Sequence, residues 1–168
     1  AAGEVMQLMN VHNPDVSEAA YRKVIYRKTA RLFEAGAQIA AILTDRNPTD
    51  EAAMICYGQN LGTAFQLVDD ALDYDASPEE LGKNLGDDLA EGKLTLPLIH
   101  ALKHAEQSDK IVIQTALKTQ NLEALPNILK IVSATGSLDF TRDCAQQHIE
   151  VAIQSLYAVV PNDYQQAL

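Results

Sequence analysis

Apolar residues return every three or four positions over most of the chain, the spacing at which side chains share one face of an α-helix. The first long stretch follows Asp15, where Ser17 is placed to cap a helix. Its apolar positions are Val24, Ile25, Leu32, Phe33, Ile39 and Leu43. The pattern predicts a helix of several turns over this stretch.

A second long helix is predicted after the turn D-R-N-P-T-D, with Thr49 or Asp50 at its start and its end near Tyr74. Gly58 and Gly62 stand four residues apart in it and therefore share one face. Because glycine has no side chain, we expect a neighbouring helix to come close at this face.

Helical spacing returns in four later segments, residues 95–103, 109–118, 122–132 and 138–159. Residues 76–92 are rich in glycine and charge and hold a proline, which predicts a loop with one short helical turn at most. No segment alternates between apolar and polar residues with a period of two, so no sheet is predicted. The sequence thus predicts an all-α fold.

Length and composition place this fold among ordinary globular proteins. The chain has 168 residues, of which 47% are hydrophobic and 21% charged, and we expect residues 1–168 to form one domain. The net charge of −10 argues against nonspecific binding to nucleic acid, whose affinity comes from Lys and Arg on phosphates.

Cysteine usage and apolar runs indicate the compartment. Cys56 and Cys144 form no C-x-x-C motif, and no secretory leader precedes them, so a reducing cytoplasmic location is expected. No run approaches the roughly 18 apolar residues of a membrane span. We therefore predict no transmembrane segment, and both cysteines are expected to pack as small apolar side chains.

The stretch A-F-Q-L-V-D-D-A-L-D-Y-D, residues 64–75, places several carboxylates in an apolar helix. Asp69 and Asp73 are four residues apart and share a face, and Asp70 flanks the same groove. The spacing therefore predicts that three carboxylates converge. Like charges at this spacing destabilise a helix, so a cation is expected between them, and Mg²⁺ prefers such oxygen ligands.

Basic residues near the carboxylates extend this interpretation to a phosphate. Lys83 and Lys93 follow the motif in sequence, and the first long helix carries Lys28 beside Thr29. Mg²⁺ is commonly held by one or two carboxylates together with substrate phosphates. The combination indicates a site for a metal and a diphosphate.

These residues also have other interpretations. An EF-hand beginning at Asp73 would need Gly where Pro78 stands. His100 and His104 have metal-ligand spacing, but no acidic third ligand stands beside them in sequence. Aspartate clusters are often only solvated surface, single lysines often only solubilise a loop, and Thr29 has the alternative of bonding back to its own helix. Tyr74 and Phe65 are most simply core residues.

The residues around the aspartates resemble a known family. The segments G-x-x-F-Q-L-V-D-D-A-L-D-Y and K-N-L-G-D-D-L-A-E-G-K-L-T-L-P-L-I are similar to the second aspartate-rich region of the trans-polyprenyl diphosphate synthases, most closely those of the bacterial octaprenyl type. The segments G-E-V-M-Q-L-M-N and Y-R-K-T-A-R-L-F-E-A resemble that family's middle helices. The resemblance covers essentially the whole chain.

The resemblance implies an enzyme, a prenyltransferase that joins an allylic diphosphate to isopentenyl diphosphate in an all-α bundle of the isoprenoid synthase type. Mg²⁺ would promote ionisation of the allylic diphosphate. The product would be an all-trans polyprenyl diphosphate for isoprenoid biosynthesis, including quinone side chains such as that of ubiquinone. The family's metal ligands and catalytic aspartates match Asp69, Asp70 and Asp73. Its substrate-binding residues match Lys28, Thr29, Gln66, Lys83 and Lys93, with Lys28 also catalytic.

The resemblance also implies that the chain is the C-terminal portion of such an enzyme. The family's first aspartate-rich motif and its isopentenyl diphosphate site belong to an N-terminal half without counterpart here. We therefore expect the bundle to be incomplete, the chain alone to be inactive, and the full-length enzyme to be a homodimer. The alternative is a noncatalytic helical subunit or interaction module. A terpene cyclase is disfavoured because its second motif usually mixes Asn, Ser or Thr, and Glu.

Overall fold

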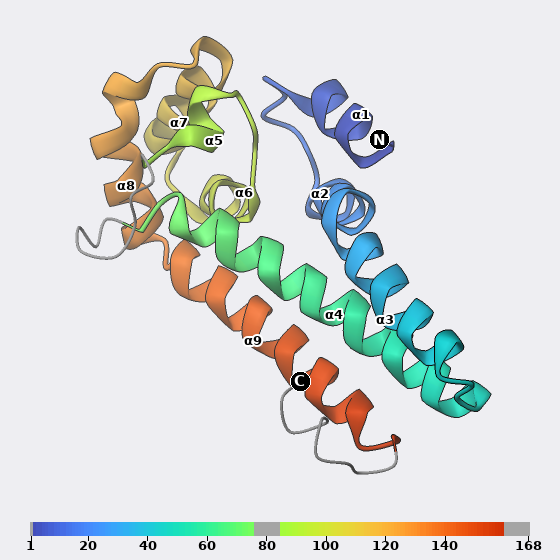
Figure 1. Cartoon of the computed structure of the whole chain (residues 1–168). Helices are drawn as coiled ribbons and strands as arrows, with labels where there is room; N and C mark the ends of the chain where they lie inside the picture. Colours follow the sequence, from blue (N-terminus) through green and yellow to red (C-terminus); the bar gives the residue numbers. More distant parts are fainter. Residues whose placement is uncertain (1, 76–84, 160–168) are drawn as a thin grey trace.

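The computed structural model describes residues 2–75 and 85–159, and within them it contains helices and no strand (Figure 1). In chain order the elements are α1 (Ala2–Asn10), α2 (Glu18–Ile25), η1 (Tyr26–Ala30), α3 (Arg31–Leu43), α4 (Pro48–Leu72), α5 (Asp87–Ala90), α6 (Leu96–His104), α7 (Gln107–Thr119), η2 (Leu122–Ala124), α8 (Leu125–Ala134) and α9 (Ser137–Leu156). The predicted all-α class is confirmed. None of these helices combines the length and the hydropathy that a membrane span needs.

The three longest helical stretches lie side by side, with α4 between α3 and α9 (Figure 1). Glycines permit the close approach on one side of α4. A β-carbon on Gly58 would lie 2.6 Å from the carbonyl oxygen of Phe33, and one on Gly62 would lie 2.7 Å from the α-carbon of Ala30. The predicted close approach at these two glycines is therefore confirmed.

Side-chain caps set where the long helices begin. Ser17 caps α2 as predicted, its hydroxyl accepting an N–H from the first turn. In α4 the predicted start is wrong by one or two residues, because Asn47 accepts the N–H groups of Thr49 and Asp50 and the helix begins before them. The same helix ends at Leu72, two residues earlier than predicted.

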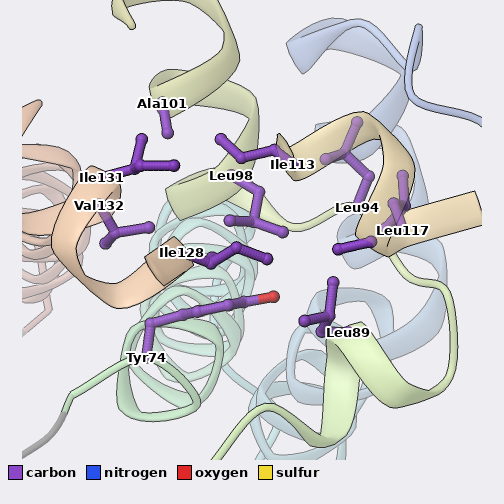
Figure 2. Packing of buried hydrophobic residues seen from close by; sticks show 11 residues of the cluster. Tyr74, Leu89, Leu94, Leu98, Ala101, Ile113, Leu117, Ile128, Ile131 and Val132 are labelled. Atoms are coloured by element: carbon purple, nitrogen blue, oxygen red, sulfur yellow. The ribbon is translucent and has the colours of Figure 1, made fainter. Parts of the chain in front are cut away.

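The largest cluster of buried apolar side chains lies where α5, α6, α7 and α8 meet the end of α4 (Figure 2). Tyr74 lies within it beside Leu98 and Ile128 and is only 1% exposed, so its assignment to the core is confirmed. Phe65 is 58% exposed, and its assignment to the core is wrong. Cys144 is buried as expected.

A contact joins the loop after α1 to the loop before α6. The backbone N–H of His12 donates to the carbonyl oxygen of Gly92 at 2.8 Å. Gly92 has a φ of +68°, and a β-carbon there would lie 2.5 Å from the His12 ring. This position thus requires glycine, and the contact holds the segment after α1 against the residue that precedes Lys93.

A π turn, η1, joins α2 to α3. The N–H of Arg31 donates to the carbonyl oxygen of Tyr26, five residues back. In an α-helix it would donate to the carbonyl oxygen four residues back. The turn carries Lys28 and Thr29, two residues singled out from the sequence. Single π turns inside helices occur frequently at functional sites.

Candidate active site

A pocket of about 100 Å³ opens between α1, α2, η1, α4 and the segment that leads into α6. Because a cavity needs roughly 10–15 Å³ to hold one water, this pocket has room for several water molecules or a group of similar size. Its charged lining residues are Lys28, Asp69, Asp70, Asp88 and Lys93. Its polar lining residues include Gln7, Asn10, Tyr21, Gln66 and Thr95.

Asp70 is the most buried carboxylate of the pocket, with 3% of its surface exposed. The hydroxyl of Tyr21 donates to its Oδ2 at 2.5 Å, and Gln66 Nε2 donates to its Oδ1 at 2.8 Å. Burial and, after it, the negative charge of Asp88 raise the pKa of Asp70 to about 7, although these two hydrogen bonds lower it. Both oxygens therefore already have donors from the protein.

Gln66 links Asp70 to the π turn. Thr29 Oγ1 donates to Gln66 Oε1 at 2.8 Å, so the alternative that Thr29 bonds back to its own helix is not what the structure shows. Gln66 Nε2 also lies 3.4 Å from Asp69 Oδ2, besides its bond to Asp70. One amide therefore contacts both carboxylates of the Asp pair.

Asp73 has a different environment from the one predicted. It follows the last residue of α4, and its two carboxylate oxygens accept the N–H groups of Asp87 and Asp88 at 2.9 and 3.2 Å. Burial, followed by repulsion from Asp88, raises the pKa of Asp73 to about 6. The side chain caps α5 and is not part of the pocket lining.

The prediction that Asp69, Asp70 and Asp73 converge is therefore corrected. Successive residues of a helix are separated by about 100°, so Asp70 is rotated from Asp69 into the core while Asp73 turns to α5. Within residues 2–75 and 85–159, no three His, Cys, Asp or Glu side chains form a group that could hold a metal ion by itself.

Asp88 is the carboxylate that sequence reasoning missed. It lies on α5, lines the pocket, and has its pKa raised by burial, with a further contribution from the charge of Asp69. Lys93 and Lys28 oppose this rise. The available signal is the D-D pair after Gly86, which lies both in the predicted loop and in the segment K-N-L-G-D-D-L-A-E-G-K-L-T-L-P-L-I that resembles the family.

Some of the lysines that were predicted to bind phosphate lie in this pocket. Lys93 Nζ lies 3.6 Å from Asp88 Oδ1 and also forms an ion pair with Glu91. Lys28 lines the same pocket from the π turn. Lys83, the third lysine of the prediction, lies outside the described residues. Two of the three lysines thus share the pocket with Asp69 and Asp88.

The two histidines considered as metal ligands have other neighbours. The rings of His100 and His104 lie 4.2 Å apart between centroids, and His100 stacks on Phe140 at the same distance. His100 Nδ1 lies 3.0 Å from Ser137 Oγ. These contacts account for His100 as a packed residue between α6 and α9.

Comparison with known proteins adds independent findings. Residues 1–134 match the family model described as polyprenyl synthetase. The octaprenyl diphosphate synthase of Escherichia coli strain K12 is 48% identical over 169 aligned residues, which cover 100% of this chain and 52% of that protein.

Two solved structures have the same fold over half of their length. A decaprenyl diphosphate synthase from Rhodobacter capsulatus superposes with a TM-score of 0.92 at 33% identity, covering 99% of this chain and 52% of that one. A polyprenyl synthase from Caulobacter crescentus CB15, complexed with calcium and isoprenyl diphosphate, gives 0.91 at 38% identity, with coverages of 99% and 51%. The chain spans about half the length of the relatives it matches.

Proposed function

Because this chain belongs to the polyprenyl synthetase family, we propose that it forms part of a Mg²⁺-dependent prenyltransferase. The reaction joins an allylic diphosphate to isopentenyl diphosphate and gives an all-trans polyprenyl diphosphate. The observation that carries this proposal is one pocket in which Asp69 and Asp88 lie with Lys28 and Lys93. Carboxylates for a metal and lysines for phosphates are both needed to hold a metal diphosphate.

The donor set fits Mg²⁺ without a group of three carboxylates. Mg²⁺ is usually bound through one or two carboxylates, with waters and substrate phosphates completing its shell. Asp69 and Asp88 would supply the protein oxygens, and Asp73 remains a proposed ligand only if it leaves the N–H groups of α5. The cation, when bound, would neutralise charge on the departing diphosphate.

The residues of the chain supply electrostatic stabilisation. Lys28 and Lys93 would donate hydrogen bonds to the diphosphate, whose negative charge grows as its bond to the allylic carbon breaks. Thr29 would keep the Gln66 amide in contact with Asp69 and Asp70. Lys83 is proposed to bind the same diphosphate.

Exposed apolar side chains lie four positions in sequence from two charged residues of the pocket. Leu32 lies four residues after Lys28 and is 76% exposed, and Phe65 lies four residues before Asp69 and is 58% exposed. The Phe65 ring contacts that of Phe33 with centroids 5.6 Å apart. A charged end beside an apolar surface suits a substrate with a diphosphate head and a hydrocarbon tail.

The pocket contains one set of acidic residues, whereas the proposed reaction involves two substrates. We propose that the remaining half of the synthase supplies a second aspartate-rich motif and the isopentenyl diphosphate site. The chain alone would then bind Mg²⁺ and diphosphate weakly without condensing prenyl units. The complete enzyme would be a homodimer.

The test is a calorimetric titration of the folded chain with Mg²⁺ and a nonhydrolysable farnesyl diphosphate analogue, alone and with the remaining half of the synthase. We expect metal-dependent binding that the other half strengthens and that Asp69→Ala reduces at least tenfold. Asp143→Ala is the control, since Asp143 is exposed on α9. Absence of binding in both conditions would instead favour a noncatalytic helical subunit.

A further inference from the structure

A chain of hydrogen bonds joins three elements at the wall of the pocket. Tyr21 on α2 donates to Asp70 Oδ2 at 2.5 Å, and Asp70 Oδ1 accepts from Gln66 at 2.8 Å within α4. Gln66 in turn accepts from Thr29 in the π turn at 2.8 Å. Tyr21, Gln66 and Asp70 are 4%, 7% and 3% exposed, so little solvent is available to replace these partners.

These contacts determine the orientation of the Gln66 amide. Its oxygen faces the hydroxyl of Thr29, and its NH₂ group faces Asp70 at 2.8 Å and Asp69 at 3.4 Å. A flipped amide would place its oxygen against two carboxylates, whereas the hydroxyl of Thr29 can donate or accept and does not select between the two orientations. The position of Asp70 therefore affects which group Gln66 presents to Asp69.

Tyr21 is not placed to act on a substrate with its hydroxyl, because that hydroxyl is committed to Asp70. Removing it would leave Oδ2 of Asp70, whose side chain is buried with 3% exposed, without its protein donor. The carboxylate would then turn toward Gln66 Nε2, the remaining donor, and compete with Asp69 for it. An effect on the pocket would follow without a direct contact to the ligand.

We propose that Tyr21 is a positioning residue that anchors Asp70 in the core and, through Gln66, sets the orientation of Asp69 for a metal-bound diphosphate. This role rests on the proposed function. It distinguishes the two adjacent aspartates: Asp69 faces the ligand, and Asp70 holds the supporting hydrogen bonds. The residue that supports the metal ligand thus comes from α2, outside the aspartate motif.

The test compares Tyr21→Phe with Tyr26→Phe in the 168-residue chain. Tyr26 also donates to a carboxylate, Glu34 Oε2 at 2.8 Å. Because Tyr26 and Glu34 both lie outside the pocket lining, Tyr26→Phe is a matched control. Each variant is titrated with inorganic diphosphate in saturating Mg²⁺ and again in EDTA. Circular dichroism and thermal unfolding confirm that each variant is folded.

We expect Tyr21→Phe to weaken Mg²⁺-dependent diphosphate binding about 10-fold to 100-fold, as is typical when a supporting partner of a metal ligand is removed. Binding in EDTA, which depends on Lys28 and Lys93, should change less than twofold. Tyr26→Phe should match the wild type in both conditions. This split separates positioning from a general loss of structure, which would weaken both kinds of binding.

Three results would overturn the inference, and they can be distinguished. Wild-type binding by Tyr21→Phe would remove the positioning role and leave the proposed function intact. An equal loss with and without Mg²⁺ would assign Tyr21 a purely structural role. No Mg²⁺-dependent binding by the wild-type chain would reject the proposed function, and the role of Tyr21 with it.

Discussion

At the scale of single residues, the carboxylates of the pocket come from two separate parts of the sequence. Asp69 is presented by α4 and Asp88 by α5, and the backbone of α5 is held by the Asp73 side chain. Burial and repulsion from Asp69 raise the pKa of Asp88 in spite of Lys93. Neighbouring carboxylates with raised pKa values beside a pocket are a physical indication of a functional site.

Replacement of Asp88 tests this arrangement. We expect Asp88→Asn to weaken Mg²⁺-dependent diphosphate binding at least tenfold and to stabilise the metal-free chain, because it removes repulsion from Asp70 and Asp73. Asp87→Asn is the matched control, since Asp87 is exposed and contributes its backbone N–H to Asp73. Calorimetry and urea unfolding measure the two effects, and equal behaviour of both variants would reject the role of Asp88.

Protonation of Asp70 makes stability depend on pH. Its pKa is 3.8 as a free group and about 7 in the fold, where burial and the charge of Asp88 raise it. A raised pKa contributes stability that is fully present below the unfolded value and is lost as pH rises through the folded value. We expect the free energy of unfolding of the metal-free chain to fall between about pH 4 and about pH 7.

The measurement is urea unfolding in EDTA across this pH range, for the wild type and for Asp70→Asn. The variant cannot titrate at this position, so its stability should fall less steeply with pH. Equal slopes for the two proteins would show that Asp70 does not carry the dependence. Added Mg²⁺ should reduce the slope in the wild type, because metal binding favours deprotonated carboxylates.

At the scale of helices, the close contact of α4 with η1 and α3 depends on glycine. A β-carbon at Gly62 would lie 2.7 Å from Ala30 Cα and 2.9 Å from Phe33 Cβ. We expect Gly62→Ala to destabilise the fold by about 1–3 kcal/mol, since backbone atoms must move apart. Gly36→Ala is the control: no atom lies within 4 Å, and it should stabilise α3 by up to about 1 kcal/mol. Thermal unfolding measures both changes, and a neutral Gly62→Ala would contradict the packing argument.

The helices themselves could be predicted from the sequence because their apolar spacing and caps are local signals. Ser17 and the pair of glycines in α4 are examples. The arrangement of the site could not be predicted in the same way. The hydrogen bonding of Asp70 depends on Tyr21 from another helix, and that of Asp73 depends on the N–H groups of α5. These are contacts between segments distant in sequence, which periodicity does not report.

At the scale of the whole molecule, large apolar side chains remain on the surface. Leu8 and Met9 on α1 are 71% and 78% exposed, and Leu32 and Leu43 on α3 are 76% and 78% exposed. Exposed apolar surface of this kind marks an interaction face or a tendency to aggregate. This agrees with a chain that spans about half the length of the relatives it matches.

We expect the chain alone to self-associate as its concentration rises, and the other half of the proposed synthase to suppress this by covering apolar surface. Sedimentation velocity over a concentration series measures the effect. Leu32→Ser with Leu43→Ser should reduce self-association without changing the helical content. A chain that stays monomeric at all concentrations would show that these side chains do not require burial against a partner surface.

The π turn constrains the length of the chain as well as its shape. Tyr21 and Lys28 lie on either side of its start, and both reach the same pocket. The turn uses five residues where an α-helix uses four, so loss of one residue within it would restore α-helical geometry and leave α2 and α3 with the same relative faces, whereas loss of one residue between Tyr21 and the turn would rotate Tyr21 by about 100° away from Asp70. Among related chains the number of residues between Tyr21 and the turn should therefore stay constant, while loss of a single residue within residues 26–30 should be tolerated as a return to α-helix.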